Sequence, residues 1–288
     1  MSRTRAAGNT PRAGILTEDS GPVVVGILNI TPDSFSDGGD FLDPEAAARR
    51  AFAMLDEGAA VLDLGGESTR PGSDPVSPEE ELRRVIPVIE CILAARPEAV
   101  ISVDTHRAET ARSALEAGAR LVNDVTALRG DPRMASVVEE AACPVILMHM
   151  QGEPKTMQND PHYEDVVREV KDFLAQRAEY AISSGIRPEN LIVDPGIGFG
   201  KDLEHNLALL RNLDAVVDLG FPVLVGASRK RFIGEITGVQ EAKERVFGTV
   251  ATTVLAHEQG ASYFRVHDVR ANLEALAVVE AVLHASRR

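Results

Sequence analysis

Short runs of aliphatic and β-branched residues recur along the 288-residue chain, and amphipathic segments separate them. Eight of these runs predict β-strands: VVVGILNI from Val23, VLDLGGES from Val61, VISVDT from Val100, LVNDVT from Leu121, PVILMH from Pro144, LIVDPG from Leu191, PVLVGAS from Pro222 and YFRVHDV from Tyr263. Apolar residues at three- and four-residue spacing predict helices between them, for example over residues 44–57, 78–95, 163–184 and 241–259.

Nearly continuous apolar strands that alternate with amphipathic helices indicate a parallel sheet covered on both faces. Eight repeats favour closure, so the predicted fold is α/β, a single (β/α)8 TIM barrel. A doubly wound open sheet would alternate in the same way, but no G-x-G-x-x-G follows the first strand. Residues 1–21 have little periodicity and predict a flexible N-terminal tail, which leaves residues 22–288 for the barrel domain.

Composition narrows the possible partners. The formal net charge of −14 disfavours nucleic acid and anionic membranes. No apolar run approaches the roughly 18 residues of a membrane span. Cys91 and Cys143 lie in apolar surroundings without metal-ligand spacing, which is typical of buried thiols in a reducing compartment. The sequence therefore predicts a cytoplasmic protein that acts on small molecules.

Polar residues concentrate at the carboxyl ends of the predicted strands, which meet at one mouth of a barrel where such enzymes carry their chemistry. They are Asn29, Asp63, Glu67 to Arg70, Asp104, Asn123, Asp124, His149, Asp194, Ser228 to Lys230, Arg265, His267 and Asp268. Asp104, Asn123 and Asp194 would form a polar floor, and a flat heterocycle with amino and ring N–H groups could supply the donors that buried carboxylates need. The alternative is that one or two of them bond only to loop amides.

The last two predicted strands carry positive charge instead. Arg229, Lys230 and Arg231 follow the seventh strand, while Arg265 and His267 alternate within the eighth and so share one face. Barrels commonly hold phosphate in the loops after these two strands, so the cluster predicts a site for an organic phosphate or diphosphate. A solvated basic turn is the alternative for residues 229–231.

Two loops rich in Gly, Pro and hydroxyl residues follow the first and second strands, ITPDSFSDGGDF at residues 30–41 and GGESTRPG at residues 65–72. Each carries one strong contact group, Phe35 or Arg70, as a mobile lid requires. A structural turn is the alternative for both. Asn29 ends the first strand and could ligate a Mg²⁺ carried by the diphosphate, because this hard ion accepts a carbonyl oxygen.

The motifs resemble those of dihydropteroate synthase, the folate-pathway family that sulfonamides target. The matching stretches occur in order at strand ends, over about residues 22–286: GILNITPDSFSDGG, DLGGESTRPG, SVDT, NDV, DPGIGFGK, GASRKRFIG and RVHDV. The resemblance implies a barrel homodimer that joins 7,8-dihydropterin-6-ylmethyl diphosphate to 4-aminobenzoate and releases pyrophosphate. It also implies early C–O cleavage, followed by attack of the neutral arylamine on a pterin-stabilised cation.

The resemblance further implies individual roles for the matching residues. The pterin ring would be held by Asp104, Asn123, Asp194 and Lys230. The diphosphate would be held by Asn29, Arg265 and His267, with Asn29 also on Mg²⁺ and Thr69 nearby. The aminobenzoate pocket would be shaped by Phe35, Arg70, Pro71 and Phe199. The catalytic set is predicted to be Lys230, Asp104, Arg265 and His267. Some members of the family carry Ser at the position of Arg231, and that Ser can contact the carboxylate of 4-aminobenzoate. This chain differs from those members at that position.

Two other functions stay open at this point. A non-catalytic or methyl-transfer barrel that binds a pterin or folate, for example to present it to a corrinoid partner, would leave Arg265 and His267 unexplained. A Schiff-base aldolase would use Lys230, with its pKa lowered by Arg229 and Arg231. The apolar stripes of the late helices could form a dimer face or pack on the barrel, and the sequence does not separate the two.

Overall fold

The computed structural model describes residues 21–31, 43–68, 75–152 and 155–285. This part of the chain forms eight parallel strands in one sheet, in the order β6-β5-β4-β3-β2-β1-β8-β7. The strands are β1 (Val23–Asn29), β2 (Val61–Gly65), β3 (Ile101–Asp104), β4 (Leu121–Asp124), β5 (Val145–Met148), β6 (Leu191–Asp194), β7 (Leu224–Val225) and β8 (Tyr263–Val266). A parallel bridge between Val193 and Val223 joins β6 to the residue before β7, so the sheet closes. The predicted (β/α)8 barrel is confirmed, whereas the tail predicted for residues 1–21 lies outside the described residues except for Gly21.

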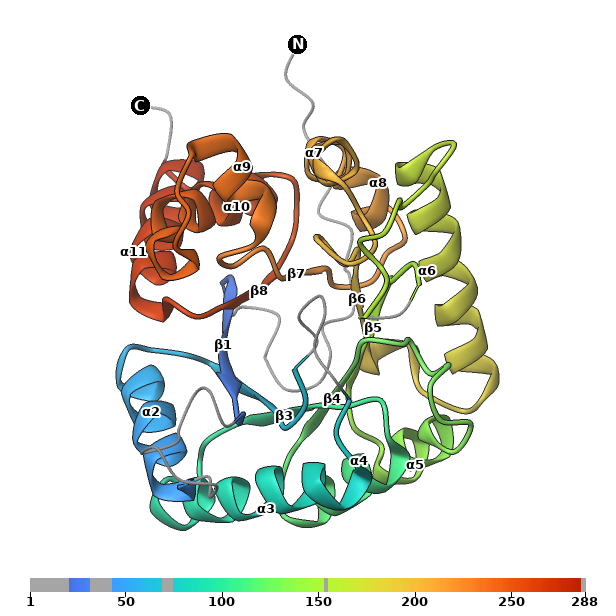
Figure 1. The fold of residues 1–288 in the computed structure, drawn as a ribbon, viewed down its shortest axis with the longest axis vertical. Helices are drawn as coiled ribbons and strands as arrows, with labels where there is room; N and C mark the ends of the chain where they lie inside the picture. Colours follow the sequence, from blue (N-terminus) through green and yellow to red (C-terminus); the bar gives the residue numbers. More distant parts are fainter. Residues whose placement is uncertain (1–20, 32–42, 69–74, 153–154, 286–288) are drawn as a thin grey trace.

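Helices surround the strands on the outside of the barrel (Figure 1). They are α2 (Pro44–Asp56), α3 (Pro78–Ala95), α4 (Ala108–Glu116), α5 (Met134–Ala141), α6 (Val166–Ser183), α7 (Leu203–Arg211), α8 (Asp214–Val217), α9 (Arg231–Thr237), α10 (Val246–Glu258) and α11 (Val269–Leu283), with the 3-10 turns η1 (Pro188–Asn190) and η2 (Ala242–Glu244). The helix predicted over residues 241–259 is divided into η2 and α10. None of the described helices is long and apolar enough to span a membrane.

Local sequence explains where several helices begin and end. The residues Asp43, Ser77, Asp165 and Asp202 precede α2, α3, α6 and α7, and each side chain accepts a hydrogen bond from a backbone N–H of the first turn. Such caps contribute about 1 kcal/mol each. Gly118 follows α4 with a φ of 107°, and a Cβ there would lie 2.5 Å from Leu93 Cδ1. Only glycine fits this turn into β4.

The interior of the barrel changes character along its axis. Its amino-terminal half is filled by the apolar side chains of Val23, Val25, Val61, Leu121, Ile146, Ile192, Leu224 and Tyr263. Two positions further along the strands, the inward side chains become polar, at the buried Asp63, Asn123 and Asp194 and the partly buried Arg265. Because side chains two apart point to the same face of a strand, the polar layer lies directly above the apolar one. The apolar layer thus forms a rigid base beneath the strand ends.

Candidate active site

A cavity of about 610 Å³ lies at the carboxyl ends of the strands. Five predicted site residues line it: Asn29, Phe199, Lys230, Arg265 and His267. Three more, Asp104, Asn123 and Asp194, are buried at the ends of β3, β4 and β6. The remaining four, Phe35, Thr69, Arg70 and Pro71, lie outside the described residues. The structure therefore brings residues from distant parts of the chain to one mouth, while their roles toward ligands stay predictions.

Asp194 and Arg265 lie on either side of Gly226. A Cβ on Gly226 would lie 3.8 Å from Arg265 Cβ and 3.9 Å from Asp194 Oδ2. Asp194 from the middle of the chain and Arg265 from its end therefore lie close together, beside a glycine that lines the cavity. The missing side chain at residue 226 keeps the space between the two groups open.

Arg265 is held among carboxylates rather than apart from them. Its Nε donates to Asp63 Oδ2 at 2.5 Å, and its Nη2 donates to Asp104 Oδ2 at 2.7 Å. Asp63 Oδ2 also accepts a hydrogen bond from Asn123 Nδ2 at 3.0 Å. The donor that balances the buried acid Asp104 thus comes from the chain itself. Asp63 was predicted to lie at the mouth but was given no role there, although its inward place on β2 between Val61 and Gly65 could have indicated one.

The buried charges shift one another's proton affinities. Burial raises the pKa of Asp104 to about 7, against the opposing charge of Arg265, and the neighbouring charge of Asp63 raises it further. Burial alone would lower the pKa of the Arg265 guanidinium, but Asp63 and Asp104 together outweigh burial and raise it. Arg265 therefore stays charged at any physiological pH, whereas the charge of Asp104 depends on pH near neutrality.

Lys230 reaches the cavity along the loop after β6. Its Nζ donates to the carbonyl of Ile197 and lies 4.3 Å from the centroid of the Phe199 ring. A Cβ on Gly198 would lie 2.8 Å from Lys230 Cδ, so glycine at this position makes room for the lysine stem. Burial lowers the pKa of Lys230 to about 7, against the attraction of Asp194. Desolvation is the main cause, rather than the neighbouring arginines.

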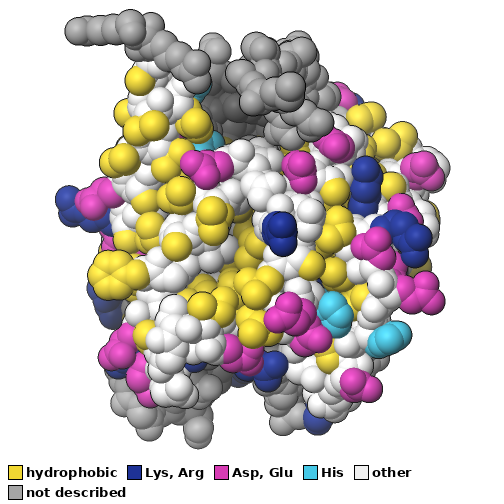
Figure 2. Space-filling view, turned by 90° about the horizontal axis from the view of Figure 1, so that it is seen from above, with side chains coloured by type: hydrophobic (Ala, Val, Ile, Leu, Met, Phe, Trp, Pro, Cys, Tyr) yellow, Lys and Arg dark blue, Asp and Glu magenta, His cyan; other side chains and the backbone are white. Residues whose placement is uncertain are grey.

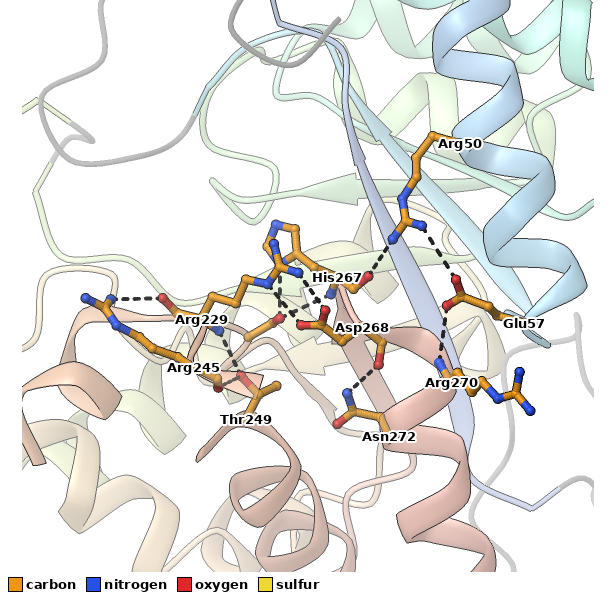
Figure 3. A network of polar contacts seen from close by, with 10 residues as sticks. Arg50, Glu57, Arg229, Arg245, Thr249, His267, Asp268, Arg270 and Asn272 are labelled. Carbon is orange, nitrogen blue, oxygen red and sulfur yellow. Dashed lines mark hydrogen bonds and ion pairs between the residues drawn. The ribbon is translucent and has the colours of Figure 1, made fainter. Parts of the chain in front are cut away.

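His267 is oriented by Ser228. The Ser228 hydroxyl oxygen accepts from the His267 backbone N–H at 3.1 Å and lies 3.0 Å from His267 Nδ1. The hydroxyl can donate its proton to Nδ1 or accept from it, so the contact holds the ring in either tautomer. Figure 3 shows His267 next to the residues that fix its backbone.

The side chains of His149 and Asp124 bond to loop residues and do not line the cavity. Lys201 Nζ lies 2.9 Å from His149 Nδ1 and donates to the carbonyls of Gly196 and Phe199 at 3.0 Å each. Burial, with the charge of Lys201, lowers the pKa of His149 to about 2. Asp124 accepts three hydrogen bonds from Thr126 and Leu128, which hold the loop after β4. Lys201 was overlooked because DPGIGFGK matches no phosphate loop, although a lysine ending a glycine-rich loop was a usable signal.

The closed barrel and its mouth of buried acids and cations define an enzyme class that binds small anionic heterocycles. The family model described as "Pterin binding enzyme" matches residues 25–267. Dihydropteroate synthase of Synechocystis sp. is 48% identical over 259 residues, which cover 90% of this chain and 89% of that protein. The chain belongs to the dihydropteroate synthase family of pterin-binding enzymes.

Solved structures agree with this assignment. Xanthomonas albilineans dihydropteroate synthase with 4-aminobenzoic acid has a TM-score of 0.90 and 48% identity, covering 96% of this chain and 100% of that chain. The same organism's enzyme in complex with 7,8-dihydropteroate has a TM-score of 0.85 and 47% identity, covering 94% of this chain and 97% of that chain. The likeness extends over nearly the whole chain in both cases.

Proposed function

We propose that this chain is a transferase of folate biosynthesis that condenses 7,8-dihydropterin-6-ylmethyl diphosphate with 4-aminobenzoate, giving 7,8-dihydropteroate and pyrophosphate. The observation that carries the proposal is the cavity lined by Lys230, Arg265 and His267, with the buried Asp194 next to its lining residue Gly226 and within reach of the Lys230 and Arg265 charges. The solved relatives with 4-aminobenzoic acid and in complex with 7,8-dihydropteroate support this choice of substrates.

The acids are suited to hold the pterin ring. Asp194 Oδ1 accepts from Gly196 N at 2.7 Å, which fixes the carboxylate while Oδ2 faces the space beside Gly226. Burial raises the pKa of Asp194, and the charges of Lys230 and Arg265 with the Gly196 N–H oppose this. A pterin that donates its amino and ring N–H groups would supply further hydrogen bonds to the ionised form. Asn123, held by Asp63, would complete the floor.

The diphosphate would be bound by Arg265, His267 and Asn29. Arg265 supplies a permanent charge, and the His267 ring, held by Ser228, would donate through Nε2 when that nitrogen carries a proton. Within the described ranges, no three His, Cys, Asp or Glu side chains cluster as metal ligands. A Mg²⁺ would therefore depend on diphosphate oxygens and water, with the Asn29 carbonyl as the protein ligand, a set that this ion accepts. When bound, it would neutralise charge on the leaving group.

The reaction then needs orientation more than a strong base. As the methylene C–O bond breaks, its electron pair stays on the diphosphate, where Arg265 and His267 stabilise the developing charge. The neutral amine of 4-aminobenzoate forms the C–N bond, and its proton leaves afterwards to solvent. Phe199 lies against Lys230, so the arylamine would stack beside the pterin rather than meet water.

The other two functions are not favoured. A non-catalytic or methyl-transfer barrel has no use for Arg265 and His267 lining the cavity beside Lys230. An aldolase lysine would need a carbonyl substrate in place of its present partners, the Ile197 carbonyl and the Phe199 ring. Arg231 is paired with Glu235 at 2.9 Å and is not placed as a bare cation beside Lys230.

The chain is further proposed to work as a homodimer in the cytoplasm. The exposed apolar side chains of α10 and α11 include Phe247, 88% exposed, and Val282, 69% exposed. Figure 2 shows hydrophobic side chains gathered over the side of the molecule that these helices occupy. Such a patch favours burial against a second copy. The two free thiols, Cys91 and Cys143, fit a reducing compartment.

The direct test is a coupled assay of pyrophosphate release together with mass-spectrometric detection of 7,8-dihydropteroate, with and without Mg²⁺. Net product should require 4-aminobenzoate, and Lys230→Ala should abolish it. Lys171→Ala on α6, at a residue that does not line the cavity, is the control for removing a lysine. An active Lys230→Ala variant, or a wild-type protein that forms no product from both substrates, would overturn the proposal.

A further inference from the structure

Arg229 has an unusual backbone for its residue type. Its φ is 59°, in the left-handed region that non-glycine residues seldom adopt. Residues held in this region cost free energy and persist where the surrounding structure over-determines them. Ser228 and Lys230, which flank Arg229, both line the cavity. The conformation of this one residue therefore sets the direction in which two site side chains leave the chain.

The side chain of Arg229 closes a two-pronged ion pair with Asp268. Its Nε donates to Asp268 Oδ2 at 2.9 Å, and its Nη2 donates to Oδ1 at 2.6 Å. Figure 3 shows the guanidinium directed at this carboxylate. Both carboxylate oxygens are engaged, so the charge of Arg229 is neutralised within the chain. In the basic run after β7, which was predicted to bind phosphate, Arg229 and Arg231 are thus both paired with carboxylates of the chain.

The backbone of Arg229 is fixed from the other side by α10. Its N–H donates to Thr249 Oγ1 at 3.0 Å, and its carbonyl accepts from Arg245 Nη1 at 3.1 Å. Arg245 also donates to the carbonyl of Lys230 at 3.3 Å. Arg245 and Thr249 therefore secure the same short segment that the ion pair secures.

Asp268 is itself anchored next to a site residue. Its carbonyl accepts from Asn272 Nδ2 at 2.8 Å, and the preceding carbonyl, that of His267, accepts from Arg50 Nη2 at 3.0 Å. The ion pair thus joins the loop carrying Lys230 to the strand end carrying His267. These two segments lie 39 positions apart along the chain at the Arg229–Asp268 contact.

We propose that the Arg229–Asp268 ion pair is a positioning device, a latch that holds Lys230, Ser228 and His267 in register across the mouth, and that Arg229 is not itself an anion ligand. The proposal deepens the proposed function and rests on it, because it concerns the placement of the diphosphate and pterin contacts. Arg245 and Thr249 form its backbone half, and Asp268 forms its side-chain half.

A positioning role and an anion-binding role for Arg229 predict opposite results for Asp268→Asn. An amide can accept from only one prong of the guanidinium, so the latch loosens. We expect the KM for the pterin diphosphate and the Kd for inorganic pyrophosphate with Mg²⁺, measured by calorimetry, each to rise about tenfold. If Arg229 were an anion ligand, removing the carboxylate would release its charge and pyrophosphate would bind more tightly.

A double-mutant cycle tests the coupling. Arg229→Met should match Asp268→Asn in effect, and the double variant should be no worse than the worse single variant. Glu274→Gln is the matched control, because it makes the same change in the carboxylate that pairs with Arg270 on the exposed face of α11. It should leave both constants unchanged.

Two measurements distinguish a variant that is less stable from one in which the site residues are misplaced. Calorimetry reports Kd for the folded fraction, which a purely structural role would leave unchanged while the unfolding midpoint fell. Arg229→Lys, which keeps the charge without the fork, supplies a milder second variant. An unchanged or tighter pyrophosphate Kd in Asp268→Asn, with the wild type active, would overturn the latch alone. An inactive wild type would instead overturn the proposed function.

Discussion

Asp63 offers the sharpest test of how the buried charges hold the site. Its side chain is fully buried, and its Oδ2 accepts from both Arg265 Nε and Asn123 Nδ2. Asp63→Asn keeps the size of the side chain and one oxygen that can accept both hydrogen bonds, but it removes the negative charge. Hydrogen bonds with a charged partner contribute about 1.5–3 kcal/mol and neutral ones about 0.5–1.5, so the expected loss is about 1–2 kcal/mol.

If the lost hydrogen-bond free energy leaves Arg265 less well positioned, the catalytic rate should fall as well. A change of about 1.4 kcal/mol is tenfold, so kcat/KM for the pterin diphosphate should fall about 5- to 30-fold in Asp63→Asn. Asp63→Ala also removes the acceptor, leaving the Asn123 amide unpaired and Arg265 with Asp104 alone. Breaking a buried pair in this way costs about 3–5 kcal/mol of stability, so this variant should be markedly less stable.

The assay is pyrophosphate release at varied pterin diphosphate, paired with denaturant unfolding of each variant. Asp218→Asn, an exposed carboxylate after α8, controls for the loss of one charge from the chain. A wild-type kcat/KM in Asp63→Asn would show that Asp104 alone positions Arg265. Equal unfolding free energies for the Asn and Ala variants would refute the argument from buried hydrogen bonds.

Three further predictions follow from the same geometry. First, kcat/KM for the pterin diphosphate should peak near pH 7, because burial raises the pKa of Asp104 to about 7 and lowers that of Lys230 to about 7. It should fall at lower pH as the carboxylate gains a proton and at higher pH as the ammonium loses one, and a profile flat from pH 5 to 9 would contradict both assignments. Second, Lys201→Met should leave two loop carbonyls without their donor and raise the KM for 4-aminobenzoate several-fold through displacement of Phe199, whereas the surface control Lys171→Met should not; equal KM values would contradict it. Third, Phe247→Glu should shift the mass measured by sedimentation from dimer to monomer, and an unchanged dimer would place the interface elsewhere.

The fold was predictable because the sequence signals for its strands and helices are local. Each strand is a short apolar run, each long helix has its own periodicity, and capping residues such as Asp43 and Ser77 lie beside the helices that they begin. The division of residues 241–259 into η2 and α10 was not predictable, since Arg245 leaves the helical conformation where it bonds to the loop carrying Arg229. That partner is 16 positions away, beyond the reach of a helical repeat.

The sequence by itself determined which residues reach the mouth of the barrel, because alternation along each strand and strand order fix the direction and height of a side chain. Only the tertiary structure decided which of them pair. Arg265 meets Asp63 and Asp104 across 202 and 161 positions of sequence. Arg229 lines the cavity, yet its guanidinium pairs with Asp268. Charge pairing depends on distances of a few ångströms between side chains, and closure of the barrel sets those distances.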